Sequence, residues 1–98
     1  GPTTLAEIQG FHADHALITV GALDAGAGAA DYNFDEAQVA RAMIDSAGGV
    51  IVAADATKFD RRAAFAVCPL ERLTALVTDR EPQGRLAEAL AAAGTAVH

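Results

Sequence analysis

Short apolar segments alternate with amphipathic ones along this chain of 98 residues. Four of the apolar segments are rich in aliphatic and β-branched residues and are continuous rather than alternating: HALITV (15–20), GVIVAA (49–54), TALVTD (74–79) and TAVH (95–98). Continuous apolar strands are typical of parallel sheets, which are covered on both faces. The pattern therefore predicts four parallel strands that are buried on both sides.

Three amphipathic segments are predicted as helices. Residues 34–47 carry apolar side chains at helical spacing, and Asn33 stands three residues before Glu36 in a capping-box arrangement. Residues 82–94 repeat the helical spacing between the last two strands, and residues 3–9 form a short leading helix. The helices thus separate the strands, as in βαβ units.

This alternation places the chain in the α/β class. We expect one Rossmann-like domain over residues 1–98, with a mainly parallel sheet and flanking helices. A four-stranded open sheet leaves two edges that need partners. Either further strands precede residue 1 in a longer protein, or another copy of the chain covers an edge, so a homo-oligomer is expected.

Composition restricts the partners. Hydrophobic residues make up 52% of the chain and charged residues 20%, which predicts a folded domain. The net charge of −6 argues against duplex DNA binding by this chain, because DNA binding requires clustered Lys and Arg. No apolar run approaches the length of a membrane span. The single cysteine, Cys68, has no second cysteine to pair with and is expected to be a buried thiol in a reducing compartment. The chain is therefore predicted to be cytoplasmic.

The glycine-rich loop at 21–33 is the first candidate site. It follows a strand and precedes a helix, which is where open α/β sheets bind ligands. Its spacing matches neither a dinucleotide fingerprint nor a phosphate-binding P-loop, so a flexible turn explains the glycines equally well. The candidate ligand-binding residues in it are Asp24, Gly26, Gly28, Asp31, Tyr32 and Asn33.

Lys58 follows the second strand and is expected on the same edge of the sheet as Asp24. It can neutralise a phosphate or carboxylate, although on position alone a solvated surface lysine is the commoner case. Glu36 is the capping partner of Asn33 on spacing alone. Asp14 and His15 form either an acid/base pair or, more often in such positions, a cap at the start of a strand.

The sequence contains no recognisable motif for catalysis or for metal binding. The three histidines, His12, His15 and His98, have no metal-ligand spacing with one another or with Cys68. No nucleophile and base stand in a recognisable arrangement. We therefore predict no catalytic residue, no metal and no cofactor.

Several spaced motifs, in order, closely resemble the C-terminal effector-sensing domain of DeoR-family transcriptional regulators. The resemblance covers nearly the whole chain. The matching residues are Ala13 and Asp14; Gly21, Leu23 and Asp24; Tyr32, Asn33, Glu36 and Ala37; Arg41 to Ile44; Asp55, Lys58 and Phe59; and Thr78 and Asp79.

The resemblance implies a sensor for a phosphorylated sugar or related metabolite, which controls operator binding by a DNA-binding domain absent from this chain. Asp14, Glu36 and Lys58 would join the loop residues above as ligand-binding residues. The chain departs from the family where Ala30 replaces a common threonine and Asp60 replaces a glycine beside Lys58, and that acidic side chain would weaken an anion site.

The implied fold is similar to that of ribose-5-phosphate isomerase and the CoA-transferase-like proteins, which supplies an alternative: a sugar-phosphate isomerase-like enzyme. Leu17 stands where that enzyme has its second aspartate, and no lysine opens the glycine loop. The chain is accordingly predicted not to be an enzyme. An oligomerisation module without a ligand is the third interpretation.

Overall fold

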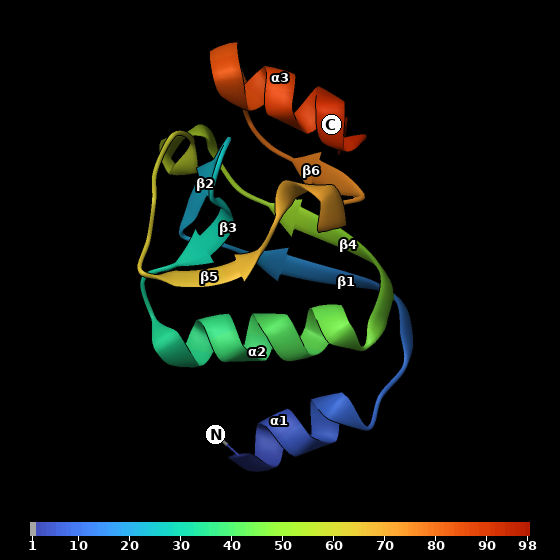
Figure 1. The fold of residues 1–98 in the computed structure, drawn as a ribbon. Helices are drawn as coiled ribbons and strands as arrows, with labels where there is room; N and C mark the ends of the chain where they lie inside the picture. Colours follow the sequence, from blue (N-terminus) through green and yellow to red (C-terminus); the bar gives the residue numbers. More distant parts are fainter. Residues whose placement is uncertain (1) are drawn as a thin grey trace.

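A computed structural model describes residues 2–98, which form two small sheets and three helices (Figure 1). Helices α1 and α2 lie on one side of the strands, and α3 lies at the opposite end of the molecule. The elements are, in order, α1 (Pro2–Gln9), β1 (Ala13–Thr19), β2 (Ala22–Asp24), β3 (Gly28–Asp31), α2 (Phe34–Asp45), β4 (Ala47–Ala53), η1 (Ala56–Lys58), β5 (Phe65–Cys68), η2 (Leu70–Arg72), β6 (Ala75–Val77), α3 (Gly84–Ala93) and β7 (Ala96–Val97).

The larger sheet contains the four predicted strands in the order β1-β4-β6-β7, and every neighbouring pair is parallel. The register places Thr19 of β1 beside Ala53 of β4, and Ala53 beside Val77 of β6. The three strands therefore end side by side, at the carboxyl end of the sheet. The predicted α/β class and the parallel sheet with flanking helices are confirmed.

Burial on β1 alternates, so the prediction of strands covered on both faces is wrong for this strand. Ala16 and Ile18 are buried, whereas Leu17 between them is 63% exposed. The buried face packs into the single core together with Val50, Val52 and Leu76 of the neighbouring strands. The other face of β1 has no helix over it within residues 2–98, which is why its apolar side chains remain accessible.

Helix α2 crosses from the first strand region to β4 and buries Ala37, Ala40 and Ile44 against the core. It begins at Asn33, whose side-chain oxygen accepts a hydrogen bond from Glu36 N at 2.9 Å. The predicted cap is therefore present. The final helix, α3, buries Leu86 and Leu90 and ends at Gly94, which adopts φ +78°.

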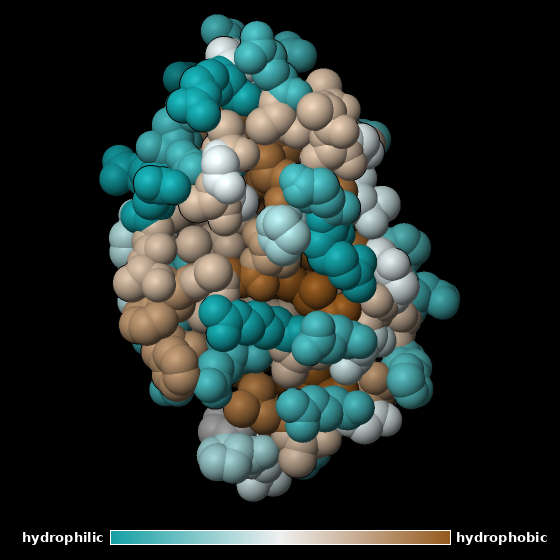
Figure 2. Space-filling view, in the orientation of Figure 1, coloured by the Kyte–Doolittle hydropathy of each residue, from teal (hydrophilic) through white to brown (hydrophobic). Residues whose placement is uncertain are grey.

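Helix α1 packs on the outside of α2 rather than on a sheet, and the Ser46 hydroxyl ties the two together by donating to Ile8 O at 3.0 Å. Hydrophobic atoms remain visible between α1 and α2 in the space-filling view (Figure 2). Ile8, Phe11 and Met43 line a cavity of about 260 Å³ there. This contact is less completely packed than the main core.

The second sheet, β2-β3-β5, is antiparallel and was not expected from the sequence. The segment predicted as a glycine loop, residues 21–33, instead forms the β2–β3 hairpin. Its strands, ALD and GAAD, contain few residues with a preference for strands. Backbone contact with β5 stabilises them, because Ala29 and Ala30 pair with Cys68 and Ala66.

Gly28 allows that contact and gives the first prediction. Its φ is +77°, and a Cβ there would lie 2.5 Å from Cys68 O and 2.9 Å from Pro69 Cα. Gly28→Ala should lower the free energy of unfolding by about 2 to 4 kcal/mol, through backbone strain and displacement of β5. Denaturant unfolding measures the change.

The matched control is Gly26→Ala in the same hairpin. The nearest atom to a Cβ at Gly26 is Asp24 Oδ2 at 3.6 Å, which is an ordinary contact. This variant should change stability by less than about 0.5 kcal/mol. Equal effects of the two substitutions would show that the close approach to β5 does not determine the glycine requirement.

Candidate functional site

The carboxyl ends of β1, β4 and β6 meet around a cavity of about 460 Å³. Its walls combine strand ends with the turn that follows β4. They are formed by Thr19, Val20, Ala53, Ala54, Asp55, Lys58, Val77, Thr78 and Asp79. Lys58 is the only cation in this set and the only lysine in the sequence. The cavity thus has the position expected of a ligand site in an open α/β sheet.

A network of hydrogen bonds holds the turn that carries Lys58. The Asp55 carboxylate accepts from Thr57 N at 2.8 Å and from the Thr57 hydroxyl, and Lys58 N donates to Asp55 O at 3.0 Å. Asp79, at the end of β6, accepts from Ala56 N at 2.9 Å. Two carboxylates beside Lys58 are therefore already engaged by donors from the turn.

The hydrogen bond from the Thr57 side chain is the main cause that lowers the pKa of Asp55. The hydrogen bond from the Thr57 backbone amide and the charge of the nearby Lys58 act in the same direction. Asp55 is thus held as a carboxylate at neutral pH. Its main effect is to order the turn, because its oxygen atoms face Thr57. Lys58 is half-buried and lines the cavity, where an anion can reach it.

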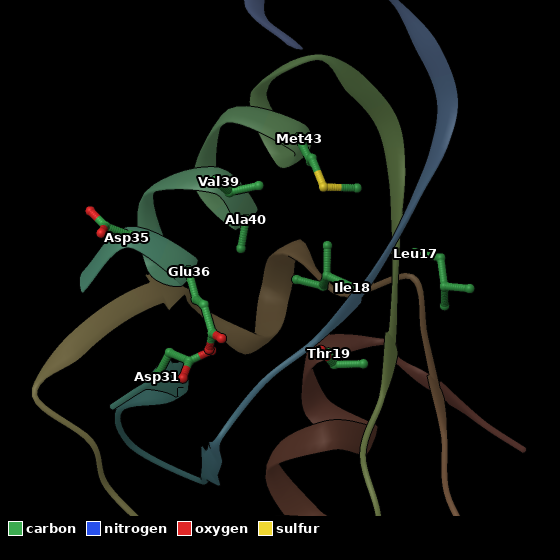
Figure 3. A pocket seen from close by; sticks show the side chains of 9 residues that line it. All are labelled: Leu17, Ile18, Thr19, Asp31, Asp35, Glu36, Val39, Ala40 and Met43. Atoms are coloured by element: carbon green, nitrogen blue, oxygen red, sulfur yellow. The ribbon is translucent and has the colours of Figure 1, made fainter. Parts of the chain in front are cut away.

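A second cavity, of about 560 Å³, lies between β1 and α2 (Figure 3). Val39, Ala40 and Met43 of α2 form one apolar wall, and Ile18 of β1 faces them. Leu17 and Thr19 also line the cavity, but the Leu17 side chain points away from α2. In Figure 3 the carboxyl groups of Asp31 and Glu36 point toward one another at one end, whereas Asp35 points away. Asp31 is 9% exposed, so this end of the groove holds a buried carboxylate facing an exposed one.

Thr19 lines both cavities, so they adjoin at the carboxyl end of β1. Asp31 and Glu36 line one of these cavities and Lys58 lines the other, so three of the predicted site residues belong to cavities that share Thr19. Thr19, Thr78 and Asp79 were not predicted as site residues from the sequence. Their position could have identified them, because each stands near the carboxyl end of a predicted parallel strand, where ligands bind in open α/β sheets.

Asp24, Gly26 and Gly28 shape the hairpin rather than line either cavity. The Asp24 carboxylate accepts from Gly26 N at 3.0 Å and from Ala27 N at 2.7 Å, and Arg62 Nε lies 3.6 Å away. The bond from Ala27, helped by Gly26 and Arg62, holds the pKa of Asp24 below its ordinary value. These contacts give Asp24 a structural role in the turn.

The hairpin and the Lys58 turn nevertheless lie side by side, as predicted. Leu23 and Phe59 form a parallel bridge, and Asp60 N donates to Leu23 O at 2.8 Å. Asp24 and Lys58 therefore flank adjacent backbone segments. Asp60 itself adopts φ +57° and lines neither cavity, so its carboxylate does not share the cavity wall with Lys58.

The remaining candidates line neither cavity. Asp14 is exposed within β1, near its amino end, so it is remote from Thr19 and is not a cap before the strand. Tyr32 is 57% exposed, and its ring lies over Gly21, where a Cβ would be 2.8 Å from the ring. Asn33 caps α2.

Within residues 2–98 no group of three or more His, Cys, Asp or Glu side chains is arranged to hold a metal ion. No helix in the same range is long and apolar enough to cross a membrane. Cys68 is buried and free, and burial raises the pKa of its thiol to about 11. The thiol is thus a core group rather than a reactive one.

The fold and the two adjoining cavities define a Rossmann-like α/β domain of the kind that binds small molecules at the ends of its strands. The chain belongs to the family of the DeoR C terminal sensor domain, whose family model matches residues 1–80. The resemblance read from the motifs is confirmed.

Relatives of the chain are regulators of transcription. It is 30% identical over 86 residues to the HTH-type transcriptional repressor CsqR of Escherichia coli, covering 88% of this chain and 33% of that protein. It is 33% identical over 84 residues to the glycerol-3-phosphate regulon repressor of Haemophilus influenzae, covering 86% and 33%. It is 29% identical over 97 residues to the HTH-type transcriptional regulator GlpR of Haloferax volcanii, covering 99% and 38%.

The chain therefore spans about a third of the length of these relatives. These relatives are named as repressors and a regulator of transcription, not as enzymes, in agreement with the prediction that the chain is not an enzyme. The isomerase-like alternative is not supported by them.

The cap of α2 provides a second prediction. Asn33→Ala should lower the free energy of unfolding by about 1 kcal/mol, because Glu36 N loses its acceptor. Among the described residues the Glu36 side chain makes no hydrogen bond back to Asn33, so Glu36→Ala should cost less than about 0.5 kcal/mol. Thermal melts of both variants, with Asn33→Asp as a control that keeps the acceptor, decide between the two roles.

The buried thiol provides a third prediction. A rise in pKa from 9.0 to about 11 lowers the thiolate fraction near pH 8 by about 100-fold. Cys68 of the folded chain should therefore react with a disulfide reagent at least about 100-fold more slowly than in denaturant. Equal rates in the folded and unfolded chain would contradict the burial.

Proposed function

We propose that the chain is the effector-binding part of a DeoR-family regulator and that its effector is a phosphorylated sugar or a related phosphorylated metabolite. The main support for this proposal is the position of Lys58, the only lysine in the sequence, in the cavity where three strands end. In this proposal its ammonium group neutralises the phosphate.

The surroundings of Lys58 suit a phosphate better than a neutral group. Thr19 lines the same cavity and can donate a hydroxyl hydrogen bond to a phosphate oxygen. The Thr78 hydroxyl donates to Arg80 O at 3.4 Å and would have to turn from it to donate to a phosphate. Asp55 and Asp79 are occupied by donors of the turn, which reduces their repulsion of an anion. The whole chain carries a net charge of −6, so a cation at the strand ends is a distinguishing feature.

The adjoining groove can receive the rest of the molecule. Asp31 and Glu36 point toward one another and offer carboxylate oxygens, which accept hydrogen bonds from sugar hydroxyls. Thr19 lies between this pair and Lys58, because it lines both cavities. An effector with a phosphate at one end and hydroxyls at the other would span the carboxyl end of β1.

One relative is named for the glycerol-3-phosphate regulon, which supports a phosphorylated effector. In the proposed regulator, binding at this site changes operator affinity through a DNA-binding domain outside the 98 residues. The chain itself carries a net charge of −6 and would not bind the phosphate backbone of DNA. Such a regulator would act in the cytoplasm and, like most soluble oligomers, as a symmetric homo-oligomer.

Lys58→Ala tests the proposal in the full-length regulator. Calorimetric titration with glycerol 3-phosphate, pentose 5-phosphates and hexose 6-phosphates should identify a ligand. The substitution should weaken that ligand by about 1–3 kcal/mol, the scale of a lost charged hydrogen bond. Stability without ligand should change by less than about 0.5 kcal/mol.

Arg85→Ala is the matched control, since it removes an exposed cation from α3 that lines neither cavity. Its affinity for the same ligand should equal that of the unmodified protein. Unchanged affinity in Lys58→Ala would overturn the proposed site. A loss in both variants would indicate a general electrostatic effect instead.

A further inference from the structure

Two carboxyl groups face one another at the polar end of the groove between β1 and α2. Asp31 is the last residue of β3 and Glu36 lies in the first turn of α2, and their carboxyl groups point toward one another (Figure 3). A third acidic residue, Asp35, points away from them. Within residues 2–98, no lysine, arginine or histidine lines this groove. The pair therefore concentrates negative charge without a cation beside it.

The Asp31 carboxylate is only partly satisfied by the protein. Asp31 is 9% exposed, and its Oδ1 accepts a hydrogen bond from Tyr32 N at 2.8 Å. In the part of the chain that the structure describes, its Oδ2 accepts no hydrogen bond, and neither Asp31 nor Glu36 forms an ion pair. Buried charges are normally paired, because an unpaired one loses its hydration without compensation. The free oxygen thus points to a group that a ligand supplies.

Local structure explains each carboxylate only in part. An acidic side chain in the first turn of α2 interacts favourably with the positive end of the helix dipole, which accounts for Glu36. The hydrogen bond from Tyr32 N accounts for one oxygen of Asp31. Neither accounts for the approach of the two groups, because like charges repel each other, most strongly where burial reduces screening by water. A cation between them would remove that repulsion.

An ammonium group fits this pair better than a metal ion does. Calcium takes six to eight oxygen ligands. Among residues 2–98, no group of three or more His, Cys, Asp or Glu side chains is arranged to hold a metal ion. An ammonium group has three donors, and its hydrogen bonds to carboxylates are of the strong, charge-assisted kind. Two facing carboxylates are therefore sufficient for it.

We infer that the effector is a phosphorylated amino sugar, whose ammonium group binds between Asp31 and Glu36 while its phosphate binds Lys58. The inference rests on the function proposed above and specifies the class of effector. Thr19 lines both cavities, so the acidic pair and the lysine border adjoining parts of one site. In a 2-amino-2-deoxyhexose 6-phosphate the amine and the phosphate are attached at distant parts of the sugar. Opposite charges at its two ends match the opposite charges of the two cavities.

Pairs of ligands that differ only in the amino group test the inference in the full-length regulator. Calorimetric titration at neutral pH compares glucosamine 6-phosphate with glucose 6-phosphate, and galactosamine 6-phosphate with galactose 6-phosphate. In at least one pair the amino sugar should bind about 10-fold more tightly or better, the scale of an added charged hydrogen bond. The N-acetylated form of that amino sugar phosphate, whose nitrogen carries no charge, should lose this advantage.

Two variants that remove the same charge from the same helical turn locate the effect. Glu36→Gln keeps an oxygen acceptor but removes one charge of the pair, so it should reduce the preference for the amino sugar to less than about threefold. Asp35→Asn is the matched control, because the Asp35 side chain points away from the pair. It should leave the preference unchanged.

Three outcomes would overturn the inference. A neutral compound such as glycerol 3-phosphate or a pentose 5-phosphate could bind as tightly as every amino sugar phosphate, and the proposed phosphate site at Lys58 would then still stand. An equal loss of preference in Asp35→Asn would indicate a general electrostatic effect. Binding of Mg²⁺ alone that Glu36→Gln abolishes would assign the pair to a metal ion. If no phosphorylated compound binds at all, the proposed function itself fails, so the two failures are distinguishable.

Discussion

The parallel pairing of β1 with β4 is the constraint on which the site depends. Its register runs from Ala13 beside Ala47 to Thr19 beside Ala53, so both strands end at the same level. Helix α2 makes the return connection, and its buried alanines allow it to lie close to the sheet. Because the strands end together, the turn after β4 places Lys58 next to Thr19. A one-residue shift in this register would exchange the buried and exposed faces of β1 and expose Ile18.

The small antiparallel sheet has a supporting role that glycine content alone did not reveal. It closes the core beside the parallel sheet, through Leu23 and Ala29 on the hairpin and Val67 on β5. It also fixes the Lys58 turn from the side, because Asp60 N donates to Leu23 O. The polar tips in this segment therefore divide into two groups. Asp24 maintains the hairpin, whereas Asp31 reaches the groove.

The sequence allowed accurate prediction wherever one segment determines its own structure. The four parallel strands and α2, with its cap at Asn33, follow from apolar spacing and local hydrogen bonding. The strands ALD and GAAD could not be predicted, since their alanines and glycine carry almost no strand preference. Their structure depends on a partner distant in sequence, because β3 pairs with β5, which approaches Gly28 closely. The candidate site was predictable in part. Lys58 and Glu36 were found by motif, but Thr19 becomes significant only once the strand ends are brought together.

The two cavities at the carboxyl end of β1 differ in chemistry. The groove beside α2 has an apolar wall of Val39, Ala40 and Met43, whereas Asp31 and Glu36 form its polar end. Thr19 connects this groove to the Lys58 cavity, because it lines both. In the proposed regulator, an effector that contacts these segments more strongly in one arrangement of the protein than in another would favour that arrangement, because a ligand shifts an equilibrium only through such differential contacts.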